Sequence, residues 1–167
     1  MGSRTYTQDA LMVLADGAAA TTANGIGQVA SANKILDLGG APSRTDLSIV
    51  GGFARADYMA VIDVSALVAS NIDNLYTLSI MGSNNADGSK PVNLASILLG
   101  NFTLLPNGST GSAATGAGST SVAGRFELPF STEQADINYE YVYLYATVAG
   151  TGKSITFKAF VAPLPEE

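Results

Sequence analysis

The sequence predicts an all-β protein in which about eight short antiparallel strands form a single β-sandwich domain. Apolar and polar residues alternate along several segments, which is the pattern of half-buried strands. Turn-forming residues separate these segments, and no long stretch has the periodicity of a helix. The chain has 167 residues, enough for one domain with its own core, and it shows no repeat of fixed period. We expect the sandwich to occupy residues 9–163, between an N-terminal arm at residues 1–8 and a C-terminal tail at residues 164–167.

The first half of the chain contains four candidate strands. Residues 9–15 form the first apolar run, for which a helical turn is the alternative interpretation. A second strand with irregular edges is expected within residues 26–38. Residues 58–64 and residues 75–81 alternate between apolar and other side chains, so each segment predicts a strand with one face in the core.

The second half begins with a long apolar stretch at residues 92–105, which Pro106 ends. Residues 106–121 are rich in Gly, Ser, Thr and Ala and have no aromatic or charged side chain. This composition predicts a flexible loop, and the alternative is an arm that becomes ordered on a partner. Residues 122–130 predict a further strand, and Pro129 near its end favours the edge of a sheet.

The end of the chain predicts an antiparallel hairpin formed by residues 139–148 and residues 155–161, which a short Gly/Thr turn joins. In the first of these strands, aliphatic side chains alternate with four tyrosines, Tyr139, Tyr141, Tyr143 and Tyr145. Alternate side chains of a strand point to opposite faces. We therefore expect the aliphatic face to close the sandwich and the tyrosine face to contact something outside it.

The charge of the chain excludes some classes of partner. The formal net charge is −6 and the sequence pI is about 4.4, which argues against nucleic acid, because nucleic-acid binding needs clustered Lys and Arg. No apolar run approaches the roughly 20 residues that span a bilayer, and no secretory signal is evident, so we expect no membrane partner. Only 13% of the residues are charged, which suggests that a partner covers part of the surface.

The absence of Cys and His excludes much of enzyme and metal chemistry. Disulfides, thiolate nucleophiles and Cys-based zinc sites need Cys, and Ser-His-Asp triads and the commonest metal sites need His. We expect no catalytic residue, no metal and no cofactor, and hence no enzyme. A glycosidase that uses two carboxylates, with Glu127 and Glu140 as candidates, is the remaining catalytic alternative.

Two short segments partly match known ligand-binding motifs. Gly152-Lys153-Ser154 resembles the end of a phosphate-binding loop, but Thr147 stands where that motif needs Gly, so we interpret it as a turn. The Asn/Asp/Gly segment at residues 84–88 resembles a calcium loop, but Leu94 stands where the bidentate Glu would be. A solvated turn is our interpretation, and a looser calcium site is the alternative.

The tyrosine stripe is the main candidate functional feature. Tyrosine supplies large, rigid contact area with a polar tip and is enriched at protein interfaces. We predict an interface made by Tyr139, Tyr141, Tyr143 and Tyr145, which Phe160 on the next strand would extend. The alternatives are a sugar-stacking platform, or side chains that pack under loops or against a neighbouring strand.

Several short motifs occur in the same order as in one known protein family. They are Asp9-Ala10-Leu11, Val13-Leu14, residues 35–38, residues 78–83, Pro91-Val92, Leu94, Leu128-Pro129, Tyr141-Val142-Tyr143-Leu144, Thr147-Val148 and residues 159–161. Through these motifs the chain resembles the small capsid cement, or decoration, proteins of tailed bacteriophages, of the type found on a Bordetella podophage. The resemblance runs from about Asp9 to Pro163. This chain departs from the family by a longer middle, an extended Gly/Ser tract and a longer N-terminal arm.

The resemblance implies a jelly-roll-like sandwich without catalytic residues. It implies a protein made in the host cytoplasm that binds the outer surface of the icosahedral head and stabilises contacts between subunits of the major capsid protein. It also implies a symmetric homo-oligomer, a dimer or a trimer. The alternative function is a carbohydrate-binding jelly-roll module of a phage adsorption structure.

Overall fold

The structure is a computed structural model that describes residues 9–38, 56–69, 73–102, 119–120 and 123–164. The arm expected at residues 1–8, most of the loop expected at residues 106–121 and the end of the expected tail lie outside these ranges. Within the described ranges, no helix is long and apolar enough to cross a membrane.

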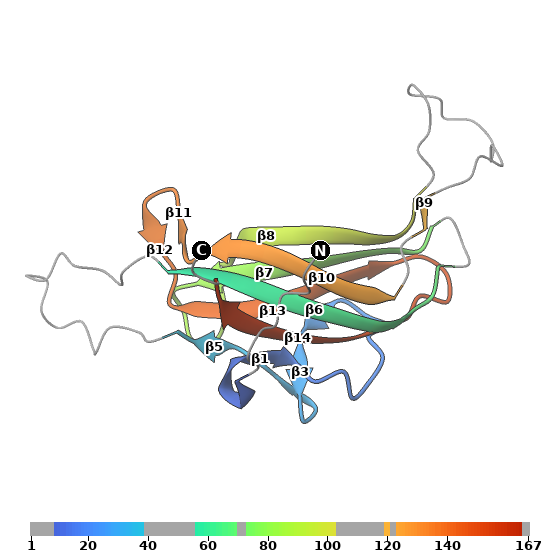
Figure 1. The fold of residues 1–167 in the computed structure, drawn as a ribbon, viewed down its shortest axis with the longest axis horizontal. Coiled ribbons are helices and arrows are strands. Elements are labelled where there is room, and N and C mark those ends of the chain that lie inside the picture. Colours follow the sequence, from blue (N-terminus) through green and yellow to red (C-terminus); the bar gives the residue numbers. More distant parts are fainter. Residues whose placement is uncertain (1–8, 39–55, 70–72, 103–118, 121–122, 165–167) are drawn as a thin grey trace, which may run out of the picture.

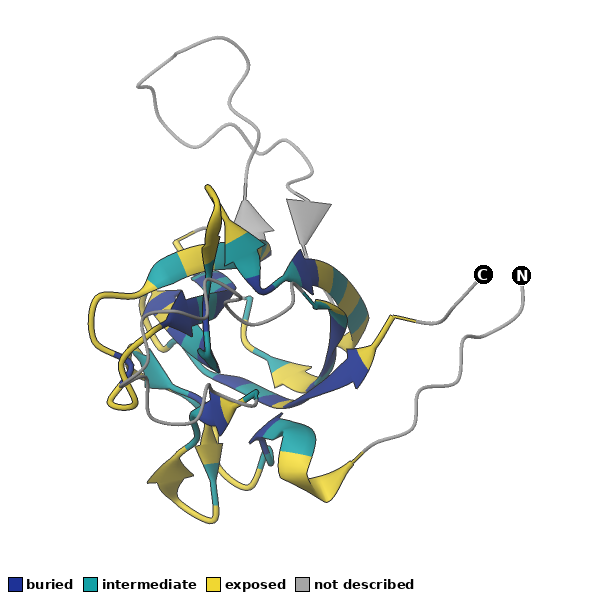
Figure 2. Cartoon of the chain, turned by 90° about the vertical axis from the view of Figure 1, so that its left-hand side faces the viewer, coloured by how far each residue is buried: buried dark blue, intermediate teal, exposed yellow. Residues whose placement is uncertain are grey.

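The fold is an antiparallel β-sandwich, as the alternation of the sequence predicts (Figure 1). The four-stranded sheet has the order β1 (Val13–Ala15), β14 (Ile155–Pro163), β6 (Asp57–Leu67) and β10 (Gly124–Ser131). The six-stranded sheet has the order β2 (Gly25–Ile26), β13 (Tyr141–Ala149), β7 (Leu75–Ser83), β8 (Val92–Phe102) and β9 (Ser119–Thr120), and β5 (Leu36–Asp37) also pairs with β13. Viewed along the strands, the two sheets curve around the core (Figure 2).

Three small elements lie outside the two main sheets. They are the 3-10 turn η1 (Ala10–Met12), the hairpin of β3 (Gln28–Val29) with β4 (Ala32–Asn33), and the hairpin of β11 (Glu133–Gln134) with β12 (Ile137–Asn138). Asp9 caps η1, because its carboxylate accepts a hydrogen bond of 2.9 Å from the Leu11 N–H. Residues 9–15 therefore contain both predicted alternatives, a helical turn at Ala10–Met12 followed by a strand at Val13–Ala15.

The core lies between the inner faces of the two sheets. Strand β13 contributes the aliphatic residues that alternate with its tyrosines, namely Val142, Leu144, Ala146 and Val148. Strand β14 contributes Ile155, Phe157, Ala159 and Val161. The predicted inward faces of these two segments are therefore confirmed. Burying one large aliphatic or aromatic side chain contributes about 1.5–3 kcal/mol, so these faces are a main source of stability.

The predicted hairpin between the last two long strands is wrong. Strand β13 lies in the six-stranded sheet and β14 lies in the four-stranded sheet, so the two strands do not pair with each other. The edges of β13 are already taken by β7 on one side and by β2 and β5 on the other. The chain between them crosses from one sheet to the other, and Gly150 (φ 104°) and Gly152 (φ 63°) supply the positive backbone angles of this crossing.

Other elements differ from prediction mainly in their lengths. The strand expected within residues 26–38 is divided among four strands of two residues each, β2 to β5. Ser119–Thr120, within the expected loop at residues 106–121, pairs with the end of β8 as strand β9. Strand β10 is an edge strand of its sheet, as Pro129 predicts.

Candidate functional site

The outward side chains of β13 lie at the centre of the six-stranded sheet. Tyr141, Tyr143 and Tyr145 share this outer face, because alternate residues of a strand point to the same side. Their cross-strand neighbours on β7 are Ser83, Met81 and Ser79, in the same order. The structure therefore brings three of the four predicted tyrosines into one row.

Tyr143 at the middle of this row is buried and is not available to a partner. Its side chain is only 3% exposed, and its hydroxyl donates a hydrogen bond of 3.0 Å to the carbonyl oxygen of Gly88. A Cβ atom at Gly88 would lie 3.0 Å from the Tyr143 ring and 3.1 Å from Ile35 Cδ1, so the loop at residues 84–90 packs closely over the tyrosine. Burial, with a smaller effect of Tyr145, raises the pKa of Tyr143 and keeps its hydroxyl a donor.

The loop at residues 84–90 is fixed by hydrogen bonds of its own polar side chains. The Ser83 hydroxyl donates to the Ser89 carbonyl oxygen at 2.6 Å, and an Asp87 carboxylate oxygen accepts from the Ser89 N–H at 2.9 Å. The Asn84 side-chain oxygen accepts from the Glu140 N–H at 3.1 Å, which ties the loop to the start of β13. Polar residues in this segment thus act as a local turn that covers the tyrosine face. In the part of the chain that the structure describes, no cluster of three or more acidic residues could hold a metal ion.

Tyr139 does not belong to the row. It precedes the start of β13 and is 8% exposed. A Cβ atom at Gly82 would lie 2.9 Å from both Cβ and Cγ of Tyr139, so the tyrosine occupies the space beside this glycine. Gly82 alternates in phase with the buried residue Ile80, which places Tyr139 at the end of the core.

Phe160 does not extend the tyrosine row either. It lies on β14 in the other sheet, where it is 6% exposed and packs with Met59, Val61 and Ala162 in a second apolar cluster. The outer faces of the two sheets are on opposite sides of the sandwich (Figure 1). The prediction that Phe160 enlarges the patch depended on the hairpin and is wrong for the same reason.

Tyr141 and Tyr145 are the predicted interface residues that keep partial exposure. Burial, a hydrogen bond and the charge of Glu140, and the charge of Asp37 together raise the pKa of Tyr141. The Tyr141 hydroxyl therefore stays protonated near pH 7. Their participation in an interface stays a prediction.

The structure reveals a larger feature around Tyr145. The three long strands of the six-stranded sheet, β7, β8 and β13, contain no Asp, Glu, Lys or Arg. Their outward positions form two cross-strand rows. One row is Tyr145, Ser79 and Ser96, and the other is Thr147, Thr77 and Leu98. We call these six residues the uncharged face.

The uncharged face is accessible over most of its area. Ser96 and Thr147 are exposed, Tyr145 and Thr77 are partly exposed, and Leu98 is 50% exposed, whereas Ser79 at the centre of its row is buried. The outer side of the four-stranded sheet is different, because it carries Lys158 and a bidentate ion pair in which Arg125 Nε lies 2.7 Å from Asp63 Oδ1. The outer side of the four-stranded sheet thus carries charged side chains, whereas the uncharged face on the six-stranded sheet carries none.

This arrangement suits a surface that becomes covered by another protein. The centres of protein interfaces are depleted of charged residues and enriched in aromatic residues such as Tyr, and hydroxyl groups can exchange hydrogen bonds with water for bonds with a partner. In the sequence this face is visible as three strand-length segments without charged residues, which can be grouped only once the strand pairing is known.

No protein-family model, no curated protein and no solved structure matches this chain. The geometry and chemistry of the uncharged face therefore carry the functional argument.

Proposed function

We propose that the protein is a structural cement, or decoration, protein of a tailed-bacteriophage capsid. It binds the outer surface of the icosahedral head and stabilises contacts between subunits of the major capsid protein. The observation that carries this proposal is the uncharged face, a group of Ser, Thr, Tyr and Leu side chains on the outer side of strands β7, β8 and β13. The resemblance of the short apolar motifs to those of the cement family supports the same function.

The distribution of charge favours docking through this face rather than through the opposite one. The chain has a net charge of −6, so many copies placed close together on a shell repel one another. A contact through the uncharged face removes no charged side chain from water, and so avoids the large desolvation penalty of buried ions. Binding through this face should not weaken as the salt concentration rises, because the contact contains no ion pair for salt to screen.

The size of the face favours attachment at several points. Two rows of three residues on three neighbouring strands cover roughly 14 Å by 14 Å, or about 200 Å², which is about a quarter of the usual 800 Å² per partner in a stable complex. One such contact is weak. A homo-oligomer, a dimer or a trimer, that attaches to several lattice positions gains affinity through multivalency.

Stabilisation of the shell follows from mass action. A ligand that binds the assembled, expanded lattice but not its dissociated subunits shifts the equilibrium toward the lattice. No enzymatic step is required. With Tyr139 and Tyr143 buried, the sugar-platform alternative lacks the row of exposed rings on which sugars would stack.

The test is co-sedimentation of the purified full chain with shells of the major capsid protein encoded by the same genome. Expanded and unexpanded shells are compared at increasing protein concentration. We expect saturable binding at a fixed ratio to lattice positions, with preference for expanded shells and no weakening between about 50 mM and 300 mM salt. Absence of binding to both shells would overturn the proposal, and binding in a glycan screen would then favour the carbohydrate-binding module.

A further inference from the structure

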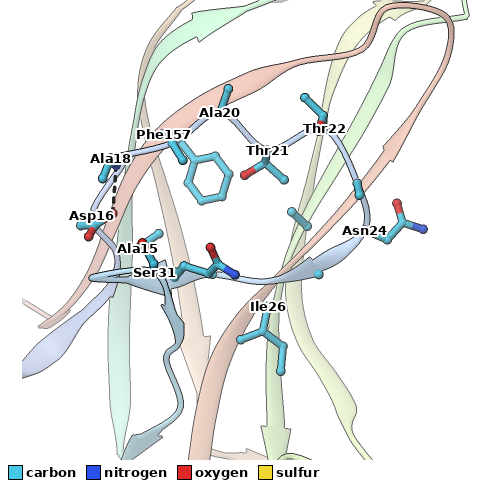
Figure 3. Close-up of a pocket in the computed structure, with 17 residues that line it drawn as sticks. Ala15, Asp16, Ala18, Ala20, Thr21, Thr22, Asn24, Ile26, Ser31 and Phe157 are labelled. Carbon is cyan, nitrogen blue, oxygen red and sulfur yellow. Dashed lines mark hydrogen bonds between the residues drawn. The ribbon is translucent and has the colours of Figure 1, made fainter.

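The sandwich has two open sides, because in the described ranges no strand of one sheet pairs with a strand of the other. On one side the outermost strands are short, since β1 has three residues and β2 and β5 have two each. The loop at residues 16–24 runs from β1 to β2 across this side (Figure 3). Its Thr21 forms a bridge with Ile155 on β14, and the Asn24 side-chain oxygen accepts a hydrogen bond of 2.8 Å from the Val148 N–H on β13. Short strands and a covering loop thus protect this side from further pairing.

The opposite side lies between β8 and β10, the last long strands of the two sheets. These two strands approach each other without pairing. Strand β10 carries residues that protect an edge, namely Arg125, Glu127 and Pro129. The eleven residues of β8 include no charged residue and no proline. Strand β8 is therefore a long edge strand without the side chains that usually prevent pairing with another chain.

Most of this edge has no neighbouring strand. Strand β9 pairs with Asn101 and Phe102 at the end of β8. The nine residues before them, residues 92–100, have β7 on one side and no strand on the other within the part of the chain that the structure describes. Their ladder with β7 has a bulge at Leu94. Nine residues at about 3.3 Å each make a free edge of roughly 30 Å, along which backbone groups can pair with another strand.

The core is also incompletely covered along this side. Of the nine described apolar side chains that pack against the main core while they keep partial exposure, five lie on β8 or β10. They are Leu94, Ala95, Ile97, Phe126 and Leu128. The Leu98 side chain on the outer face of β8 is 50% exposed. A strand added beside β8 would cover apolar surface and pair backbone groups, and both effects favour its addition.

We propose that β8 pairs with β8 of a second copy of this chain. The two strands run antiparallel about a two-fold axis, so each copy presents the same residues to the other. An axis at Ser96, the midpoint of residues 92–100, uses the whole free edge. Strand β9 of each copy then lies beyond the end of the other copy's β8 and does not obstruct the pairing. The result is one continuous sheet that runs through two sandwiches.

Charge favours a second copy at this edge over contacts between other surfaces of two copies. Each chain has a net charge of −6, so two copies repel each other where their charged surfaces meet. Strands β7 and β8, which border the contact, contain no charged residue. A partner of opposite charge would gain nothing from this edge, whereas an identical uncharged strand meets no opposing charge there.

The pairing would bring two uncharged faces together. A two-fold axis between antiparallel neighbours in one sheet is perpendicular to that sheet, so the outer sides of both six-stranded sheets point the same way. Two faces of about 200 Å² each then form one surface of roughly 400 Å². This consequence rests on the proposed capsid function, whereas the dimer itself does not.

Sedimentation velocity of the purified full chain, without capsid shells, tests the dimer. We expect an equilibrium between monomer and dimer as the concentration rises to about 100 μM, where a contact of micromolar Kd is mostly formed. A monomer over this whole range would overturn the inference. A trimer would do the same, because pairing about a two-fold axis ends at two copies. Absence of a dimer leaves the capsid proposal standing, and absence of binding to shells leaves the dimer standing.

A single cysteine tests the position of the axis. The chain contains no Cys, so Ser96→Cys introduces its one thiol. Directly opposite residues of antiparallel strands have Cα atoms about 4.5–5.5 Å apart, within the range of about 4.4–6.8 Å that a disulfide needs. Mild oxidation should therefore convert most of this variant to a covalent dimer on a denaturing gel.

Thr147→Cys is the control for the cross-link. Thr147 is exposed on the same outer face but lies on β13, two strands away from β8. We expect this variant to stay mainly monomeric under the same oxidation. Equal cross-linking of the two variants, or no cross-linking of Ser96→Cys, would overturn the inference.

A lysine beside the axis should separate the two copies. Leu98→Lys adds a charge to the edge strand two residues from Ser96, and lysine is a residue that natural edge strands use to prevent pairing. We expect the Kd of the dimer to rise at least about tenfold, because the lysines of the two copies repel each other. Thr147→Lys adds the same charge away from the contact and should leave the Kd unchanged. If Leu98→Lys is folded by circular dichroism and dimerises like the unchanged protein, the contact lies elsewhere and the inference is wrong.

Discussion

The Tyr143 hydroxyl donates a hydrogen bond of 3.0 Å to the carbonyl oxygen of Gly88, 55 residues earlier in the chain. This contact fastens the middle of the tyrosine row beneath the loop at residues 84–90. It divides the row into a structural member, Tyr143, and two partly exposed members, Tyr141 and Tyr145. Tyr143 therefore holds the loop at residues 84–90 against the outer face of the sheet.

The Tyr143→Phe variant tests this structural role. Removing the hydroxyl leaves the buried Gly88 carbonyl oxygen without this donor, so the free energy of unfolding should fall by about 1 kcal/mol. Urea unfolding followed by circular dichroism gives the value. Tyr145→Phe is the matched control, since Tyr145 is partly exposed, and it should change stability by less than about 0.5 kcal/mol. Equal effects of the two changes would contradict the assignment.

Gly88→Ala should destabilise the fold through the same contact. Gly88 has φ 71°, a region that costs other residues about 1–2 kcal/mol. The new Cβ would also press on the Tyr143 ring at 3.0 Å and on Ile35 at 3.1 Å. We expect a loss of about 2 kcal/mol in urea unfolding. Gly124→Ala is the control, because nothing lies within 4 Å of its Cβ position, and its stability should stay within about 0.5 kcal/mol of the unchanged protein.

Asp16 predicts a pH dependence of stability. Backbone hydrogen bonds from Ala18 and Ala30 lower the pKa of Asp16 in the folded state below its ordinary value of 3.8. The folded state therefore binds the proton less readily than the unfolded state, so the stabilisation is present above pH 3.8 and is lost as the pH falls through the lower folded pKa. Asp16→Asn cannot accept both bonds with its single side-chain oxygen and should melt at a lower temperature at pH 7.

The difference in melting temperature between the unchanged protein and Asp16→Asn is the quantity to follow. Other carboxylates titrate in the same range, among them Asp63 and Asp87, whose pKa values are also lowered, but they contribute to both proteins. The difference should shrink as the pH falls from 5 to below 3.8. A difference that stays constant over this range would show that the charge of Asp16 does not act through these bonds.

The local alternation of the sequence was sufficient to predict the fold class and the inward faces of the strands. It predicted that Val142, Leu144, Ala146 and Val148 face the core, because a period of two depends only on neighbouring residues. It could not predict the partner of β13. A glycine-containing turn suits a hairpin and a crossing between sheets equally well, and β7, the actual partner, lies about sixty residues earlier in the chain.

Burial of the tyrosines depends on contacts that are equally remote in sequence. Tyr143 is covered by the loop at Gly88, and Tyr139 packs beside Gly82. Nothing in the tyrosine-rich segment itself encodes these neighbours. The uncharged face is different, because the absence of charge from three strands can be counted in the sequence once the strands are assigned.

The central claim is that the uncharged face docks on a capsid shell, and a single arginine on this face tests it most directly. Ser96→Arg places a charge beside Ser79, in the same cross-strand row as Tyr145, where docking would bury it. Ser65→Arg places the same charge at an exposed position of the other sheet. Both variants are compared with the unchanged protein by co-sedimentation with expanded shells, after circular dichroism has shown that they are folded. We predict that Ser96→Arg weakens binding at least about tenfold and that Ser65→Arg binds like the unchanged protein. Unchanged binding of Ser96→Arg, with or without a loss for Ser65→Arg, would contradict the account.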